Sequence, residues 1–259
     1  MIGCTVQQLC AAVGGTLLQD SGAPVTGVTT DSRAVQPGQL FIPLVGERFD
    51  GHAYIDMALE KGAAGCLCAK IPENLQPGKF YIAVDDTEAA LGRLAGWYRG
   101  KFDIPVVQVT GSAGKTTTKE MIAAVLSQRF STLKTQANFN NAIGTPMTLL
   151  NLAPEHQAAV IETGMNHFGE LARITVAAQP DTAGSSYLKL NSVPSELTFM
   201  FSATKSHLVL FIPQYTVSNS TEPFMPQSKS LSPHKTTVPP WVITRGGHTQ
   251  NRLQQQTGW

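Results

Sequence analysis

The sequence has little charge and lacks any long apolar run. Charged residues make up 14% of its 259 positions, and 19 basic residues are balanced by 18 acidic ones. This balance argues against a protein that coats a nucleic acid, because phosphate contacts need surplus positive charge. No apolar run approaches the roughly 18 residues of a membrane-spanning helix, so we expect no membrane span.

Cysteine is scarce, and an export signal is missing. Four cysteines are too few for a disulfide-stabilised scaffold, and Cys66 and Cys68 lack a second closely spaced pair that would complete a zinc site. The N-terminal sequence MIGCTVQQLC has no basic stretch followed by an apolar core, which an export signal would need. We therefore expect a reduced, cytoplasmic enzyme.

The composition changes abruptly near residue 184. Residues 1–183 contain 25 alanines, whereas residues 184–259 contain one. The later segment holds seven prolines, eleven serines and nine threonines, and carries six basic against two acidic residues. Such a composition is typical of unfolded or extended chain. We predict a poorly structured tail over 184–259; a basic tail that binds a partner is the alternative.

The residues before this tail predict two α/β units. Residues 1–83 alternate short strands and helices, and residues 84–183 contain the buried strands IPVVQVT and AAVIETG, each followed by a helix. Alternation of this kind is typical of a doubly wound, mostly parallel sheet. We predict an α/β fold with a small N-terminal domain over 1–83, an incomplete central domain over 84–183 and an irregular tail.

Capping residues mark two of the predicted helix starts. Thr5 and Gln8 have the spacing of a capping box, in which each side chain bonds the other residue's backbone N–H. Asp86 or Thr87 is expected to cap the long helix in DDTEAALGRLAGWYRGKF, which leads into the second unit.

The strongest functional signal is the segment VVQVTGSAGKTTTKE, in which a buried strand runs through small residues into a helix. Glycines let backbone N–H groups turn inward around a phosphate, and a helix N-terminus adds unpaired donors. The pattern fits the short form GxxGK[ST], where the lysine neutralises phosphate and the hydroxyl ligates Mg²⁺. The predicted nucleotide-binding residues are Gly111, Ser112, Ala113, Gly114, Lys115, Thr116 and Thr117.

Two further segments carry candidate side chains. Glu162 ends the buried strand in AAVIETG, at the edge where open α/β sheets place ligands, and a carboxylate there can hold Mg²⁺; a capping or ion-pairing role is the alternative. The loop KTQANFNNAIGTP offers the amides of Asn138, Asn140 and Asn141. Their chemistry alone supports turn formation and substrate contact equally.

Together these segments resemble a known family. TGSAGKTTTKE, TQANFNNAIGTP and ETGMNHFGE look like the central domain of the ATP-dependent Mur ligases, and TTDSRAVQPGQLFIPLVGERFDGHAYIDMALEKGAAG looks like their N-terminal uridine-nucleotide domain. The resemblance covers about residues 1–183, with the motifs in the family's order, and is greatest to the members that add D-alanyl-D-alanine to UDP-N-acetylmuramoyl-tripeptide.

The resemblance implies a peptide ligase of peptidoglycan precursor synthesis, and with it a role in cell shape and division. Such enzymes use ATP and Mg²⁺ to convert the tripeptide carboxylate into an acyl phosphate, which the amine of D-alanyl-D-alanine then attacks. The implied protein is a cytoplasmic monomer with small-molecule substrates and no nucleic-acid partner.

The resemblance also implies roles for individual residues. Lys115 would stabilise the migrating phosphoryl group, and Thr116 with Glu162 would hold Mg²⁺, which makes Lys115 and Glu162 the expected catalytic residues. The expected substrate contacts lie in the DSR and DGH segments and in the asparagine loop, namely Ser32, Arg33, Asp50, Gly51, His52, Asn138 and Asn141.

At about Gly184 the sequence leaves the family pattern, and nothing in the tail matches the family's later residues or its C-terminal domain. We therefore expect this chain to look truncated beside the family and to bind ATP or the UDP-precursor without ligase turnover. One alternative is a non-catalytic binding module. A second is a small P-loop kinase, although no lid arginine cluster or catalytic aspartate motif is evident.

Overall fold

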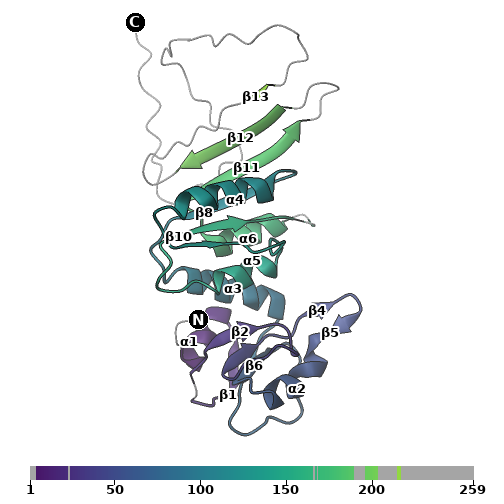
Figure 1. The fold of residues 1–259 in the computed structure, drawn as a ribbon. Coiled ribbons are helices and arrows are strands. Elements are labelled where there is room, and N and C mark those ends of the chain that lie inside the picture. Colours follow the sequence, from purple (N-terminus) through teal and green to yellow (C-terminus); the bar gives the residue numbers. More distant parts are fainter. Residues whose placement is uncertain are drawn as a thin grey trace, which may run out of the picture.

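The computed structural model describes residues 4–22, 24–165, 167, 169–189, 196–203 and 215–216. Two larger sheets and a two-stranded ribbon organise them (Figure 1). The predicted α/β architecture with mostly parallel sheets is confirmed. No helix in this described part of the chain is long and apolar enough to cross a membrane.

The first sheet has the strand order β1-β7-β6-β3-β2, and only β1 runs antiparallel to its neighbour. Its strands are β1 (Thr16–Gln19), β2 (Gly27–Thr29), β3 (Gln39–Phe41), β6 (Gly65–Cys68) and β7 (Phe80–Ala83). The same unit contains α1 (Val6–Val13), α2 (Ile55–Glu60), the 3-10 helix η1 (Gly51–Tyr54) and a ribbon of β4 (Val45–Gly46) and β5 (Phe49–Asp50).

Alternating side chains place the two faces of this sheet in different cores. Leu40, Leu67 and Ile82 pack with α1, whereas Phe41 and Cys66 pack with α2 on the other face. Both faces are covered, as expected for parallel strands that are apolar on both sides. The predicted capping box at the start of α1 is present, with both reciprocal hydrogen bonds between Thr5 and Gln8.

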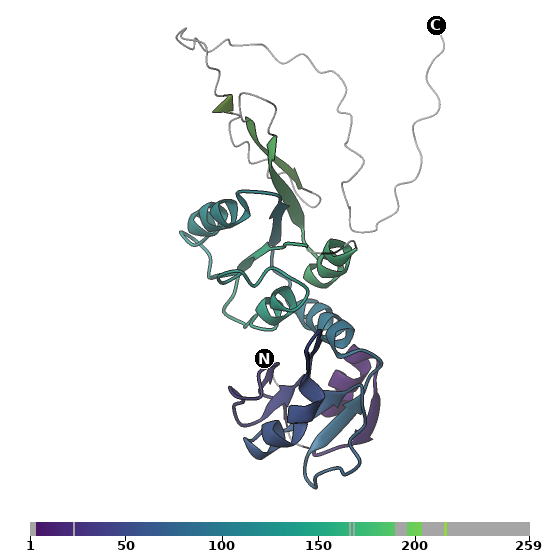
Figure 2. The same ribbon diagram turned by 90° about the vertical axis from the view of Figure 1, so that its right-hand side faces the viewer.

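The second sheet has the order β13-β12-β11-β8-β10-β9, in which β9, β10, β8 and β11 are parallel. The strands are β8 (Val106–Gly111), β9 (Thr132–Lys134), β10 (Ala158–Glu162), β11 (Thr182–Lys189), β12 (Glu196–Ala203) and β13 (Tyr215–Thr216). The connecting helices are α4 (Lys115–Leu126), α5 (Gly144–Leu149) and α6 (Glu170–Ala178). Helix α4 covers one face, and α5 and α6 lie on the other (Figure 2).

Helix α3 (Thr87–Arg99) lies between the two sheets and packs against α1, α5 and α6. Its apolar residues Leu91, Leu94 and Tyr98 belong to one core that also includes residues of both sheets. Gly96 permits the close approach of α6, because a Cβ there would lie 3.3 Å from the Cα of Ala177. The boundary predicted at 83/84 therefore lies just ahead of the helix that both units share.

The predicted tail begins inside β11, since Gly184 is within that strand. The described part of the tail forms strands because β8 offers a parallel edge: β11 pairs with β8, and β12 adds antiparallel to β11. Of the predicted tail, residues 190–195, 204–214 and 217–259 lie outside the described residues.

Asp86 caps α3 by accepting hydrogen bonds from the backbone N–H groups of Glu88 and Ala89, at 2.8 and 3.0 Å. We expect Asp86→Ala to lower the free energy of unfolding by about 1 kcal/mol, because it leaves those donors uncapped. Chemical denaturation would measure the change. Asp85→Ala removes the same charge one residue earlier and serves as the control; equal losses in the two variants would contradict the cap.

Candidate functional site

The predicted phosphate loop connects β8 to α4 at the carboxyl edge of the second sheet. Gly111 and Gly114 have φ values of 138° and 74°, a region that favours glycine. Gly114 is also the N-cap residue of α4, so the first N–H groups of that helix follow the loop directly. A strand, a turn of small residues and a helix N-terminus form a ready site for a phosphate anion.

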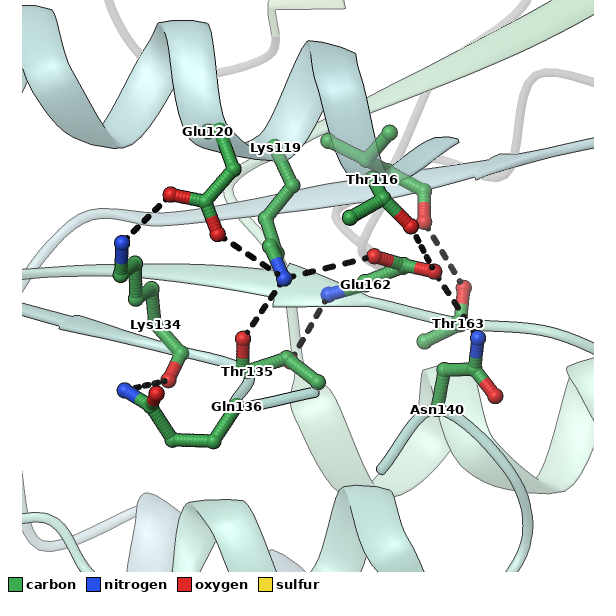
Figure 3. Close-up of polar contacts among 10 residues, drawn as sticks. Thr116, Lys119, Glu120, Lys134, Thr135, Gln136, Asn140, Glu162 and Thr163 are labelled. Atoms are coloured by element: carbon green, nitrogen blue, oxygen red, sulfur yellow. Dashed lines mark hydrogen bonds and ion pairs between the residues drawn. The ribbon is translucent and has the colours of Figure 1, made fainter. Parts of the chain in front are cut away.

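Glu162 receives two hydrogen bonds at this edge (Figure 3). The carboxylate is 1% exposed, and its Oε1 accepts from the Thr116 hydroxyl at 3.2 Å and from the Asn140 amide at 2.8 Å. The Lys115 ammonium folds back and donates to the Gly111 carbonyl at 2.8 Å. The structure thus brings Thr116 together with Glu162, and it places Lys115 next to Thr116 with its ammonium on the loop carbonyl of Gly111.

These residues fit a magnesium ion. The other carboxylate oxygen of Glu162, Oε2, is buried and accepts no hydrogen bond, and the hydroxyl of Thr116 lies against the same carboxylate. Mg²⁺ takes oxygen ligands and is commonly held by one or two protein groups together with phosphates. Among the described residues, no group of three or more His, Cys, Asp or Glu is arranged so that it could hold a metal ion.

Lys119 is a component of the site that the motif reading missed. It lies one turn after the loop and is 1% exposed, and its ammonium donates to the Thr135 carbonyl at 2.8 Å. The same ammonium lies 3.2 Å from Glu120 and 3.6 Å from Oε2 of Glu162 (Figure 3). A lysine that turns inward on a surface helix leaves no sequence signal beyond its spacing from Thr116.

The three asparagines of the loop at 138–141 have different contacts in the structure. Asn140, which was not among the predicted substrate contacts, reaches Glu162, whereas Asn138 is exposed. The side-chain oxygen of Asn141 accepts from the backbone N–H groups of Ile143 and Gly144, at 3.2 and 2.7 Å. This turn at the start of α5 is the alternative that the sequence left open, and substrate contact by Asn138 or Asn141 stays a prediction.

The DSR and DGH segments both contribute to the lining of a cavity in the first unit. It has a volume of about 420 Å³, and its lining includes Ser32, Arg33 and Gly51 together with Phe49 and Tyr54. Gly51 fits where no larger residue could, because a Cβ would lie 2.7 Å from the carbonyl oxygen of Leu44. Segments far apart in the sequence therefore meet at one polar and aromatic cavity.

Asp50 and His52 do not line this cavity; they bond each other and the chain that follows β6. His52 Nε2 accepts from the Ala69 N–H at 2.9 Å, so Nδ1 carries the proton that it donates to Asp50 at 2.7 Å. The Lys70 ammonium, aided by the hydrogen bonds from His52, holds the pKa of Asp50 well below its usual range. Direct substrate contact by Asp50 or His52 stays a prediction.

Comparison with known proteins shows the family of both units. Residues 24–99 match the Mur ligase family, catalytic domain, and residues 109–185 match the Mur ligase middle domain. This chain belongs to the Mur ligase family. The resemblance inferred from the motifs is confirmed, and it includes the phosphate loop and Glu162.

Among curated relatives, the UDP-N-acetylmuramoyl-tripeptide--D-alanyl-D-alanine ligases of Escherichia coli and Bacillus subtilis are 46% and 44% identical over 185 residues, or 71% of this chain. The chain spans about 40% of the length of these relatives. 

Solved structures of ligases are also similar to this chain. A UDP-N-acetylmuramoylalanyl-D-glutamyl-2,6-diaminopimelate--D-alanyl-D-alanyl ligase from Acinetobacter baumannii is similar with a TM-score of 0.66 and 38% identity, over 71% of this chain and 41% of that one. The MurF ligase from Thermotoga maritima, in complex with ADP, has a TM-score of 0.55 and 34% identity, over 60% and 36%.

We expect Lys119→Met to lower the free energy of unfolding by about 3–5 kcal/mol, because it leaves the buried Glu162 without its nearest cation. Lys134→Met is the matched control: Lys134 pairs with Glu120 at the surface, so its loss should cost less than about 1 kcal/mol. Denaturant titration of both variants measures the difference. Similar losses would show that the buried ammonium is not an anchor of the site.

The Arg33 guanidinium bonds Asp31 at 2.9 Å and, with the Arg33 backbone N–H, lowers the pKa of Asp31 to about 2. We expect Arg33→Gln to raise this pKa toward 3.8, whereas Arg48→Gln on an exposed turn should leave it unchanged. Because the folded-state pKa is lowered, the pair favours the folded state above pH 4 or so and stops doing so as the pH falls through about 2. NMR titration of the Asp31 carboxyl carbon measures the shift, and an unmoved pKa would refute the pairing.

Proposed function

We propose that this chain carries the ATP-binding and UDP-precursor-binding parts of a ligase that adds D-alanyl-D-alanine to UDP-N-acetylmuramoyl-tripeptide in peptidoglycan precursor synthesis. The relatives named above carry that activity in their names. The observation that carries the proposal is the contact of Thr116 with Glu162 at the carboxyl edge of a parallel sheet, beside a glycine loop whose carbonyl at Gly111 accepts from Lys115. Ligands of open α/β sheets bind at this edge.

In this proposal the loop holds the ATP phosphates. The N–H groups of the loop and of the first turn of α4 receive the phosphate oxygens, and Lys115 exchanges its bond to the Gly111 carbonyl for a bond to phosphate. Thr116 and Glu162 would hold Mg²⁺, which neutralises phosphate charge when bound. A similar solved structure is a complex with ADP, which supports nucleotide binding by this chain.

The reaction joins a carboxylate to an amine in two steps. The tripeptide carboxylate attacks the γ-phosphate of ATP, ADP leaves, and an acyl phosphate forms; the amine of D-alanyl-D-alanine then displaces inorganic phosphate. Lys115 contributes positive charge where the phosphoryl group moves, so its effect is electrostatic. The remaining contribution is positioning of the two reactants.

The cavity near Arg33 is the proposed site of the uridine nucleotide. Its aromatic side chains offer faces on which a base can stack, and Ser32 and Arg33 offer donors to ribose or diphosphate oxygens. The proposed enzyme is a cytoplasmic monomer that acts on these small-molecule substrates. Its product is a peptidoglycan precursor, which connects the proposed activity to cell shape and division.

We expect Lys115→Met to weaken binding of ATP by at least tenfold, since it removes the loop's ammonium and leaves the fold's core untouched. Isothermal titration calorimetry in the presence of Mg²⁺ measures the affinity, and Lys134→Met should bind as the unsubstituted chain does. UDP should bind all three proteins equally, because the cavity proposed for the uridine nucleotide lies in the other unit. Equal ATP affinity in all three would refute the assignment of the loop.

Phosphate release shows whether this chain turns over as a ligase, acts as a small kinase or binds its ligands without catalysis. With ATP, UDP-N-acetylmuramoyl-tripeptide and D-alanyl-D-alanine, a ligase releases phosphate only when all three are present. Binding of both nucleotides without release would favour the non-catalytic module, which agrees with the expected lack of turnover. Phosphoryl transfer that needs no D-alanyl-D-alanine would favour the kinase.

A further inference from the structure

Ser186 joins the phosphate loop from a neighbouring strand. It lies in β11 opposite Gly111 of β8 and is 1% exposed. Its hydroxyl is 2.7 Å from the carbonyl oxygen of Ala113 and 3.1 Å from that of Thr110. The family match to the middle domain ends at residue 185, and the sites described above do not include Ser186.

The loop passes directly against this strand. A Cβ built on Gly111 would lie 1.6 Å from the carbonyl oxygen of Ser186, which is far inside any permitted contact. Gly111 is therefore held against β11, and the Ser186 hydroxyl is placed where it can reach the carbonyl groups on both sides of the turn. The contact is built into the sheet and does not depend on a mobile surface side chain.

Fixing a carbonyl also fixes the N–H of the same peptide unit. The Ala113 carbonyl shares its planar unit with the N–H of Gly114, and the two groups point in nearly opposite directions. When Ser186 holds the Ala113 carbonyl toward β11, the Gly114 N–H turns to the other side of the loop. A phosphate needs N–H groups on its side and is repelled by carbonyl oxygens.

We propose that Ser186 is a positioning residue for the nucleotide phosphates: its hydroxyl draws the Ala113 carbonyl away from the anion and thereby aims the Gly114 N–H at it. This role rests on the proposed binding of ATP by the loop. The lysine and hydroxyl of such a loop hold the β- and γ-phosphates. We therefore expect Ser186 to affect binding of these phosphates and not binding of the nucleoside.

The test compares Ser186→Ala with Ser185→Ala in the full chain. Ser185 is the preceding residue of β11 and points to the opposite face, so it controls for loss of a serine from this strand. Calorimetry with Mg²⁺ measures the dissociation constants of ADP, AMP and inorganic tripolyphosphate. Thermal melting confirms that both variants are folded at the temperature used.

We expect Ser186→Ala to weaken ADP and tripolyphosphate binding about 3- to 10-fold, the loss of one hydrogen bond, and to leave AMP binding unchanged. Ser185→Ala should bind all three as the unsubstituted chain does. Unchanged ADP binding by Ser186→Ala overturns the proposal while the proposed function stands, and so does an equal loss for AMP and ADP. Failure of the unsubstituted chain to bind ADP overturns both.

Discussion

The arrangement at the carboxyl edge of the second sheet depends on one buried carboxylate. Glu162 ends β10, and its backbone N–H donates to the hydroxyl of Thr135, just after β9. Its side chain accepts hydrogen bonds from Thr116 of α4 and from Asn140 of the asparagine loop, which connects β9 to α5. A buried carboxylate without partners would cost several kcal/mol, so each of these donors helps to hold it in place. The strand ends, the helix and the asparagine loop are thereby fixed relative to one another.

Much of the fold could be predicted because local signals and tertiary packing agree. Strands apolar on both faces gave the parallel sheets, and the caps at Thr5 and Asp86 were visible in the sequence because capping depends on neighbouring residues alone. The pairing of β11 with β12 could not be predicted, because it depends on an available edge of β8 and not on composition. The Ser, Thr and Pro content of the tail indicated irregular chain from 184 onward.

The site could be predicted only where chemistry and spacing are local. The loop from Gly111 to Thr116 and the strand end at Glu162 follow from motifs, and the structure brings them together. Asn140 and Lys119 were missed because their roles arise from distances across the fold. Likewise, the motif does not reveal that Asp50 and His52 bond each other and that His52 bonds the chain beyond β6; substrate contact by these two residues stays a prediction.

The position of α3 has a consequence for how the molecule unfolds. One continuous core includes α1, both larger sheets, α5 and α6, and α3 contributes to it along its length. Tyr98 of α3 also bonds the Leu152 carbonyl from within that core. Two units that each enclosed a separate core could melt separately, but here the loss of either exposes apolar surface of the other. The two units are therefore expected to unfold together, and a ligand bound at either proposed site would stabilise both units against unfolding.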